Sequence, residues 1–247
     1  MPDLKSVLAL SMHKAGSSIT DNILTQFALA KGYQVDHIAK QVQASPLDEG
    51  EFFQAYQEKM QLTGWYYGMA RGPYVEDLQI IPKLRTIVQL RDPRDCLTSA
   101  YFSFAISHKP PEDPEKRQRF EQRRAALLEM EIDDFVLKRA MQYRRRMRIL
   151  KRIIDRHDDV LVLTYEEMVT DTPAWLNRIA EFLDQPLTDD LVKALGRDID
   201  FTVRKEDVGK HKRQVRPGDH RRKLKPATIK KVSKVLEDEL QRFNYAA

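Results

Sequence analysis

The stretch KSVLALSMHKAGSSITDNILTQFALAKG, residues 5–32, joins an apolar run, a loop of small and polar residues, and a helical pattern. Lys5–Leu10 is a short apolar run that predicts a buried β-strand. Apolar residues between Ile23 and Ala30 follow helical spacing, and Gly32 is suited to end that helix. The stretch therefore predicts a strand, a tight loop and a helix in direct succession.

The same alternation continues along the chain. Further strands are predicted at 33–38, 65–70, 84–90 and 160–164. Helices are predicted at 45–62, from Pro93 onward, and at 119–156, 173–182 and 227–242, with a proline-rich loop at 107–118. Short apolar strands that alternate with helices predict an α/β fold with a mainly parallel central sheet flanked by helices. A length of 247 residues fits one domain, 1–247.

The composition excludes several classes of protein. Cys96 is the one cysteine, which excludes an internal disulfide framework and a cysteine-rich zinc site, and the spacing of other ligand types predicts no metal. The first apolar run is too short for a secretion signal or a membrane span, so we expect a cytoplasmic protein. The net charge of +5 favours an anionic ligand.

The loop after the first strand is suited to bind a phosphate. It would offer backbone N–H groups and the positive end of a helix dipole, and Gly16 would let the backbone come close. Lys14 would supply a mobile charge, but the pattern GxxxxGK[ST] of nucleotide hydrolases is absent. A simple helix cap built from small residues is the alternative. The predicted phosphate-binding residues are His13, Lys14, Ala15, Gly16, Ser17 and Ser18.

Two further segments are candidates for anion binding. Arg91 directly follows the strand 84–90, and Ser99 comes eight residues later, so the two are predicted to converge on one phosphate. Asp92 and Asp95 are predicted to cap the helix and orient the arginines. A capped helix with surface ion pairs is the alternative. The basic segment 211–224 would, taken alone, be a solvated face or a nucleic-acid patch.

Together these segments resemble the sulfotransferase family. HKAGSS resembles its 5'-phosphosulfate loop, and LRDPRDCLTSAYF resembles its 3'-phosphate motif with Arg91 and Ser99. VLTYEEMVTD resembles the segment whose tyrosine, here Tyr165, lies near the adenine, and HKRQVRPGDHRRKL resembles the late loop that closes over the 3'-phosphate, with Arg213 and Gly218. His220 stands where that late motif usually has tryptophan, and Gln214 and Val215 also depart from it.

The resemblance implies a P-loop-like sulfotransferase fold and a donor co-substrate, 3'-phosphoadenosine 5'-phosphosulfate, which leaves as adenosine 3',5'-bisphosphate. It implies in-line transfer of the sulfuryl group to a hydroxyl or amine acceptor without a metal. Lys14 would stabilise the charge that grows on the bridging oxygen. Repulsion among basic residues also predicts that 204–224 is mobile without nucleotide and ordered with it.

The general base is left open by the sequence. The family's RTH segment corresponds to ARGPY, residues 70–74, which has no histidine. Other branches use a glutamate beyond the second strand, where this chain has Asp36 and His37. Glu76 is a third candidate. The alternative is that Asp36 and His37 merely end a strand.

Two other functions were compared with sulfuryl transfer. A nucleotide-dependent kinase with a degenerate phosphate loop would need a magnesium-holding pattern, which the sequence does not show. A noncatalytic nucleic-acid binder would use the late basic segment, but no recognised nucleic-acid module is present, so nucleic acid is not expected as a partner. Residues 40–75 and 103–125 are predicted to form the acceptor walls and lid; the acceptor and the oligomeric state are not predicted.

Overall fold

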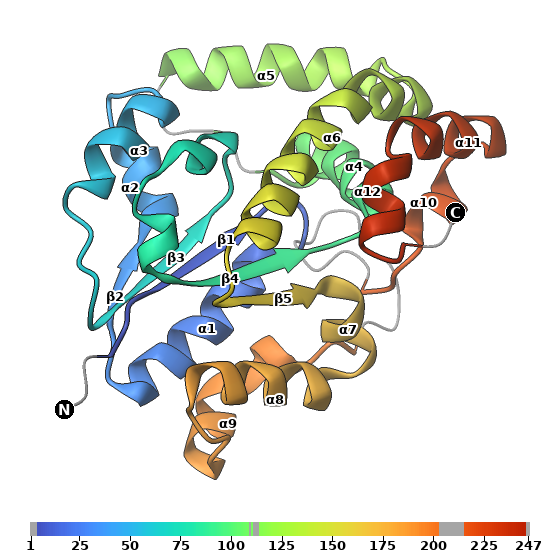
Figure 1. Ribbon diagram of the computed structural model, residues 1–247. Helices are drawn as coiled ribbons and strands as arrows, with labels where there is room; N and C mark the ends of the chain where they lie inside the picture. Colours follow the sequence, from blue (N-terminus) through green and yellow to red (C-terminus); the bar gives the residue numbers. More distant parts are fainter. Residues whose placement is uncertain (1–3, 109, 111–113, 203–214, 246–247) are drawn as a thin grey trace. The chain divides into compact units, whose positions relative to one another are not determined.

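The computed structural model describes residues 4–108, 110, 114–202 and 215–245. They form two compact units, each made of two segments of chain (Figure 1). The first unit comprises Met1–Arg91 and Arg146–Phe201, and the second comprises Asp92–Arg145 and Thr202–Ala247. All the strands of the described chain belong to the first unit, and the elements of the second are helical.

The first unit is built on a parallel sheet with the strand order β2-β3-β1-β4-β5 (Figure 1). The strands are β1 (Val7–Ser11), β2 (Gln34–His37), β3 (Trp65–Ala70), β4 (Arg85–Leu90) and β5 (Val160–Thr164). Each lies within two residues of its predicted position. The mainly parallel sheet expected from the alternation of strands and helices is confirmed.

The central strand β1 lies where the connections change direction. The chain leaves β1 for β2 and β3 on one side and then continues to β4 on the other. All five residues of β1 are buried, as a strand covered on both faces requires. Ligands of open parallel sheets bind outside the carboxyl ends of strands at such a switch point. The segment that follows Ser11 therefore stands at the expected position for a ligand site.

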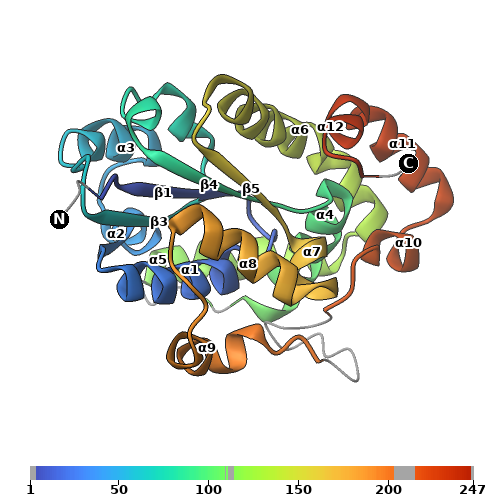
Figure 2. The ribbon, with the colours of Figure 1, turned by 60° about the horizontal axis from the view of Figure 1, so that its bottom comes forward.

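One face of the sheet is covered by α1 (Ser17–Lys31) and α8 (Thr172–Leu183) (Figure 2). Ile23 and Phe27 of α1 and Trp175 and Ile179 of α8 are completely buried in one apolar cluster with Val7. Burying a side chain of this size stabilises the fold by about 1.5–3 kcal/mol. The other elements of this unit are α2 (Ile38–Ala44), α3 (Glu49–Gln57), η1 (Pro73–Asp77), η2 (Ile81–Lys83), α7 (Tyr165–Thr170), α9 (Asp189–Leu195) and η4 (Gly196–Ile199).

The second unit contains helices from two distant parts of the sequence. They are α4 (Pro93–Phe102), the π-helical turn η3 (Ser103–Ser107), α5 (Pro114–Leu128), the first part of α6 (Ile132–Arg156), α10 (Asp219–Lys223), α11 (Pro226–Val235) and α12 (Glu237–Arg242). Arg94 on α4 donates to Ser233 Oγ on α11 at 3.0 Å, and Asp133 Oδ1 on α6 accepts from the Lys225 backbone at 3.0 Å. These polar contacts join the two segments.

Several helix boundaries differ from the prediction, for local reasons. The helix expected at 45–62 begins only at Glu49, because Asp48 and Glu51 form a capping box there. The long helix expected at 119–156 is two helices, and the first begins at Pro114, inside the segment predicted as a loop. Proline is tolerated in the first turn of a helix, where its missing N–H costs nothing. The C-terminal helix is likewise divided at Leu236.

Candidate functional site

The loop between β1 and α1 adopts a conformation that presents backbone amides. Lys14 and Gly16 both have positive φ angles, 70° and 81°, and Gly16 is the residue that caps α1. As a glycine, the cap residue has no side chain that could hydrogen-bond to the first amides of α1. Because the first amides of a helix have no partner within it, they are available to an anion at the positive end of the dipole.

Bonds from the neighbouring strand hold this loop in place. Ser11 Oγ donates to the Gln89 carbonyl at 2.9 Å, and Gln89 Nε2 donates to the Ala15 carbonyl at 3.2 Å. Arg91 donates to the Lys14 carbonyl at 3.1 Å. Two carbonyls of the loop are thus fixed by Gln89 and Arg91 at the end of β4, so the loop is preorganised.

Tyr165 brings two of the predicted donor-binding residues together. The Arg91 guanidinium lies over the Tyr165 ring, 4.0 Å from its centroid. The same ring packs against Gly16, where a Cβ atom would lie 2.9 Å from Tyr165 Cδ2. Glycine at 16 is therefore required by both its φ angle and its neighbour. Lys14, Gly16, Arg91 and Tyr165 thus form one group in the first unit.

A small cavity adjoins the phosphate loop. Its volume is about 100 Å³, and it is lined by His13, Ile38, Ala39, Val42, Glu49, Phe53, Met69, Ala70 and Arg71. Arg71 joins the cavity to the loop, because its Nε donates to Ser17 Oγ at 2.8 Å. Burial lowers the pKa of the Arg71 guanidinium, and the charge of Asp21 opposes that effect. The cavity has an apolar wall and three ionisable groups.

Glu49 is the carboxylate of this cavity, and the sequence did not identify it. It lies in the first turn of α3, directly after the cap Asp48, and a side chain at Gly72 would overlap its carboxylate. Burial raises the pKa of Glu49, while the charge of Arg146 acts in the opposite direction. A half-buried carboxylate with a raised pKa has the properties of a general acid or base. The sequence analysis included Glu49 only as one residue of the helix expected at 45–62.

None of the three bases considered from the sequence lines this cavity, and two of them, Asp36 and Glu76, are bound by other side chains. Asp36 accepts hydrogen bonds from Tyr56 and Gln41, and burial together with Asp36 raises the pKa of Tyr56. Glu76 forms a two-pronged ion pair with Arg152.

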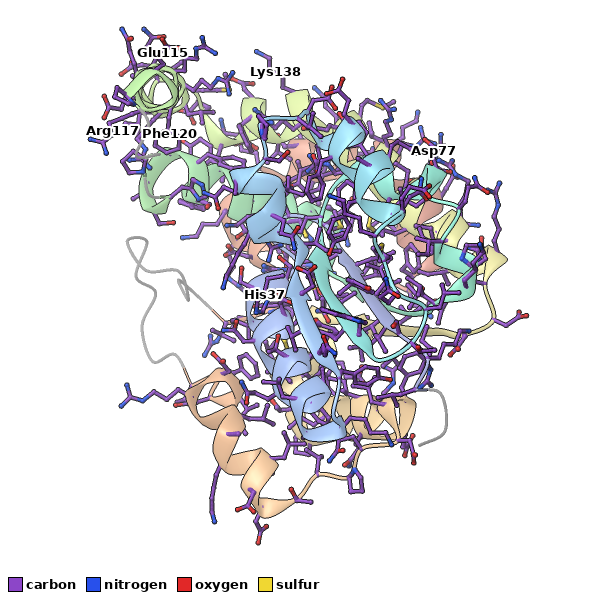
Figure 3. All side chains as sticks on the ribbon, turned by 90° about the vertical axis from the view of Figure 1, so that its left-hand side faces the viewer. His37, Asp77, Glu115, Arg117, Phe120 and Lys138 are labelled. Carbon is purple, nitrogen blue, oxygen red and sulfur yellow. The ribbon has the colours of Figure 1, made fainter. Side chains whose placement is uncertain are left out.

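His37 lies at the end of β2 (Figure 3), where its Nδ1 is 3.8 Å from Asp21 Oδ2. About a third of its side chain, 35%, is exposed. An adjacent carboxylate orients an imidazole, so the environment of His37 is compatible with proton transfer. It therefore stays a second candidate base.

In the second unit, the RDPRD segment divides its two aspartates between two tasks. Asp92 caps α4 by accepting from the Arg94 backbone at 2.9 Å and also binds the Arg94 side chain at 2.8 Å, as the sequence predicted. Asp95 instead accepts from the backbones of Gly218 and His220, at 2.7 and 2.9 Å, and from His220 Nδ1 at 2.6 Å. The prediction that Asp95 orients an arginine was therefore incomplete.

The remaining predicted donor-binding residues are placed as follows. Ser99 lies in the second turn of α4, partly exposed between buried neighbours. Gly218 caps α10 with φ 75°, and its N–H is taken by Asp95. Arg213 lies outside the described residues, as does most of the segment predicted to be mobile.

The described residues contain neither a metal-ligand cluster nor a membrane-spanning helix. No cluster of three or more histidine, cysteine, aspartate or glutamate side chains could hold a metal ion in this part of the chain. Among the helices described, none is both long and apolar enough to cross a membrane.

Comparison with known proteins identifies the family. The model of the sulfotransferase domain matches residues 4–244, nearly the whole chain. The chain belongs to the sulfotransferase family. The loop after β1, the Arg91–Ser99 segment and Tyr165 all fall within the matched region.

Solved structures of sulfotransferases share its fold. Mouse sulfotransferase SULT7A1, complexed with PAP (adenosine 3',5'-bisphosphate), is similar over 99% of this chain and 91% of its own, with a TM-score of 0.66 at 16% identity. Retinol dehydratase in a complex with retinol and PAP covers 98% of this chain and 83% of its own, with a TM-score of 0.52 at 16% identity. Sulfotransferase STF9 from Mycobacterium avium reaches a TM-score of 0.51 at 11% identity, with 99% of this chain and 77% of its own covered. No curated protein sequence matches.

Proposed function

We propose that this sulfotransferase uses 3'-phosphoadenosine 5'-phosphosulfate as donor and transfers the sulfuryl group to a hydroxyl or amine that enters the cavity beside the phosphate loop. The observation that carries the proposal is the junction of two features in one unit. An uncapped helix start with Lys14 and Gly16 adjoins a cavity that contains Glu49. Membership of the family and the PAP complexes of its structural neighbours support the donor.

The first unit offers groups for both charged ends of the donor, its 5'-phosphosulfate and its 3'-phosphate. The amides at the start of α1 and the ammonium of Lys14 would bind the 5'-phosphosulfate, and Gly16 allows its close approach. Arg91 would bind the 3'-phosphate while Tyr165 holds its guanidinium in place. Ser99 and Arg213 are assigned to that phosphate by the family motif. The remaining loop residues His13, Ala15, Ser17 and Ser18 complete the 5' site.

Transfer then requires one proton acceptor and one site for the charge that develops. Glu49 takes the proton from the acceptor, whose oxygen or nitrogen forms the new bond to sulfur. The bond between sulfur and the bridging oxygen breaks, and its electron pair stays on the departing nucleotide. Lys14 and the loop amides stabilise that charge because they already surround it before the reaction. The raised pKa of Glu49 brings its basicity closer to what proton transfer at neutral pH needs.

The experiment combines a labelled donor with an acceptor screen and variants. Products of hydroxyl and amine acceptors are detected by mass spectrometry, with ATP and magnesium as the kinase control. Glu49→Gln should lower kcat by about 10²- to 10⁴-fold, the usual contribution of a general base, while affinity for adenosine 3',5'-bisphosphate is unchanged. Glu58→Gln, at the exposed end of the same helix, is the matched control.

The pH profile gives an independent test of the base. Burial raises the pKa of Glu49, and the carboxylate stops acting as a base when the pH falls through that raised pKa. On the acidic side of the profile, kcat should therefore fall at a pH above the ordinary pKa of a glutamate. Full activity in Glu49→Gln together with loss in His37→Ala or Asp36→Asn would move the base to that residue. Transfer from ATP with no transfer from the sulfated nucleotide would refute the function itself.

A further inference from the structure

The second unit contains a larger cavity, to which the proposed transfer mechanism assigns no residue. Its volume is about 520 Å³, within the range of roughly 300–1,000 Å³ typical of small-molecule sites. It lies among η3, α5 and the first turns of α6. The lining residues are Phe104, His108, Phe120, Arg123, Arg124, Ala126, Leu127, Met130, Lys138 and Arg139.

The helix that covers this cavity buries little of its own surface. None of the residues of α5 whose burial is described is fully buried. Phe120, Arg124 and Leu127 are half-buried, and their spacing of four and three residues places them on one face. Figure 3 shows α5 end-on, with Phe120 on the side toward α4 and η3 and Glu115 on the opposite side. An apolar body in the cavity would cover this face.

The lining combines aromatic rings with aliphatic side chains. The rings of Phe104 and His108 lie 6.2 Å apart, and those of His108 and Phe120 lie 5.9 Å apart. Leu127 and Met130 complete the apolar wall. A small inorganic anion would leave these groups uncovered, so the lining favours a ligand with an apolar body.

The charged part of the lining has a single sign. Four of the lining residues are arginine or lysine, and no aspartate or glutamate is among them. Arg124 donates to the carbonyls of Phe104 and His108 and lies 4.5 Å from the centroid of Phe120. Arg123 and Lys138 are exposed and form no ion pair with any residue that the structure describes. They are therefore able to bind a ligand anion without losing a partner.

We propose that this cavity binds a small amphipathic anion, an apolar chain or ring that carries one carboxylate-like group. The apolar body would lie against Phe104, Phe120 and Leu127, and the anionic group would lie between Arg123 and Lys138. None of its lining residues is assigned to the donor, and ligand binding there does not require the transfer reaction. It uses residues inside the segment 103–125, which the sequence marked as an acceptor wall.

Calorimetry with three matched probes tests the chemistry of the ligand. Dodecanoate, used below its micelle concentration, should bind, whereas acetate and dodecyltrimethylammonium should bind at least tenfold more weakly. Arg123→Gln and Lys138→Gln should each weaken dodecanoate binding about two- to fivefold, the scale of an exposed charge pair. Arg119→Gln, on the same helix and outside the lining, should leave it unchanged.

A charge reversal keeps the test informative if α5 is sensitive to substitution. Arg123→Glu combined with Lys138→Glu should reverse the preference, so that dodecyltrimethylammonium binds more tightly than dodecanoate, which an unfolded helix would not produce. Equal binding of the two probes to the wild type would overturn the proposal. Displacement of dodecanoate by adenosine 3',5'-bisphosphate, with both glutamine variants unaffected, would place the probe at the donor site and also overturn it.

Discussion

Asp95 offers a sharp test of how the second unit is held together. Its side chain is 0% exposed, and it accepts three hydrogen bonds, from the backbones of Gly218 and His220 and from His220 Nδ1. Asp95→Asn removes the negative charge and turns an amide NH₂ toward groups that are themselves donors. A hydrogen bond to a charged group contributes about 1.5–3 kcal/mol, so losing two of the three costs roughly 3–5 kcal/mol. The exposed pair of Asp238 with Arg144, 3.0 Å apart in the same unit, should contribute at most about 1 kcal/mol.

Denaturant unfolding and hydrogen exchange measure the two consequences. Asp95→Asn should lower the free energy of unfolding by about 3–5 kcal/mol, which corresponds to a Tm lower by roughly 6–20 °C for a chain of this size. The amides of Gly218 and His220 should exchange faster, and Asp238→Asn should change neither result by much. A loss below about 1 kcal/mol with unchanged exchange at these two amides would show that Asp95 does not hold the late segment.

Three further variants address the donor site. Lys14→Ala should lower kcat by about 10²-fold or more with little effect on affinity for adenosine 3',5'-bisphosphate, because it acts on developing charge; wild-type turnover would contradict this. Arg91→Ala should weaken the binding of that nucleotide by roughly 1.5–3 kcal/mol, measured by calorimetry. Its effect should be non-additive with that of Ser99→Ala if both residues bind one phosphate. Gly16→Ala should lower both the nucleotide affinity and the free energy of unfolding more than Gly32→Ala does. Both glycines have positive φ angles, but Tyr165 crowds only position 16; equal effects of the two substitutions would refute the crowding.

The strands and the phosphate loop could be predicted from the sequence because their signals are local. A buried parallel strand appears as a short apolar run, and β1 and β4 lie within two residues of their predicted positions. The loop before α1 contains glycine and small residues at the position where the backbone requires them. The helix ends were less predictable because caps such as Asp48 and starts such as Pro114 depend on single residues.

The candidate base could not be predicted because it depends on contacts between distant elements. Asp36 and His37 stand at the expected distance after Lys14, but Tyr56 and Gln41 bind Asp36, and Asp21 faces His37. Glu49 approaches the loop only because α3 folds over the cavity beside Arg71, a pairing that no local pattern reveals. Chain distance from the loop lysine pointed to Asp36 and His37, whereas the carboxylate that lines the cavity is Glu49.

The contacts of Asp95 also limit the predicted mobility of the late segment. Asp95 belongs to RDPRD, more than a hundred residues before Gly218, yet it binds both the glycine amide and His220. His220 replaces the tryptophan usual in the family motif, and its ring is 1% exposed and bonded to Asp95. Because these bonds lie within the protein, we expect them to hold Gly218–His220 with or without nucleotide. The prediction that binding orders the segment therefore applies to the residues before Gly218, where Arg213 would meet the 3'-phosphate, and the exchange of the Gly218 and His220 amides should stay slow in either state.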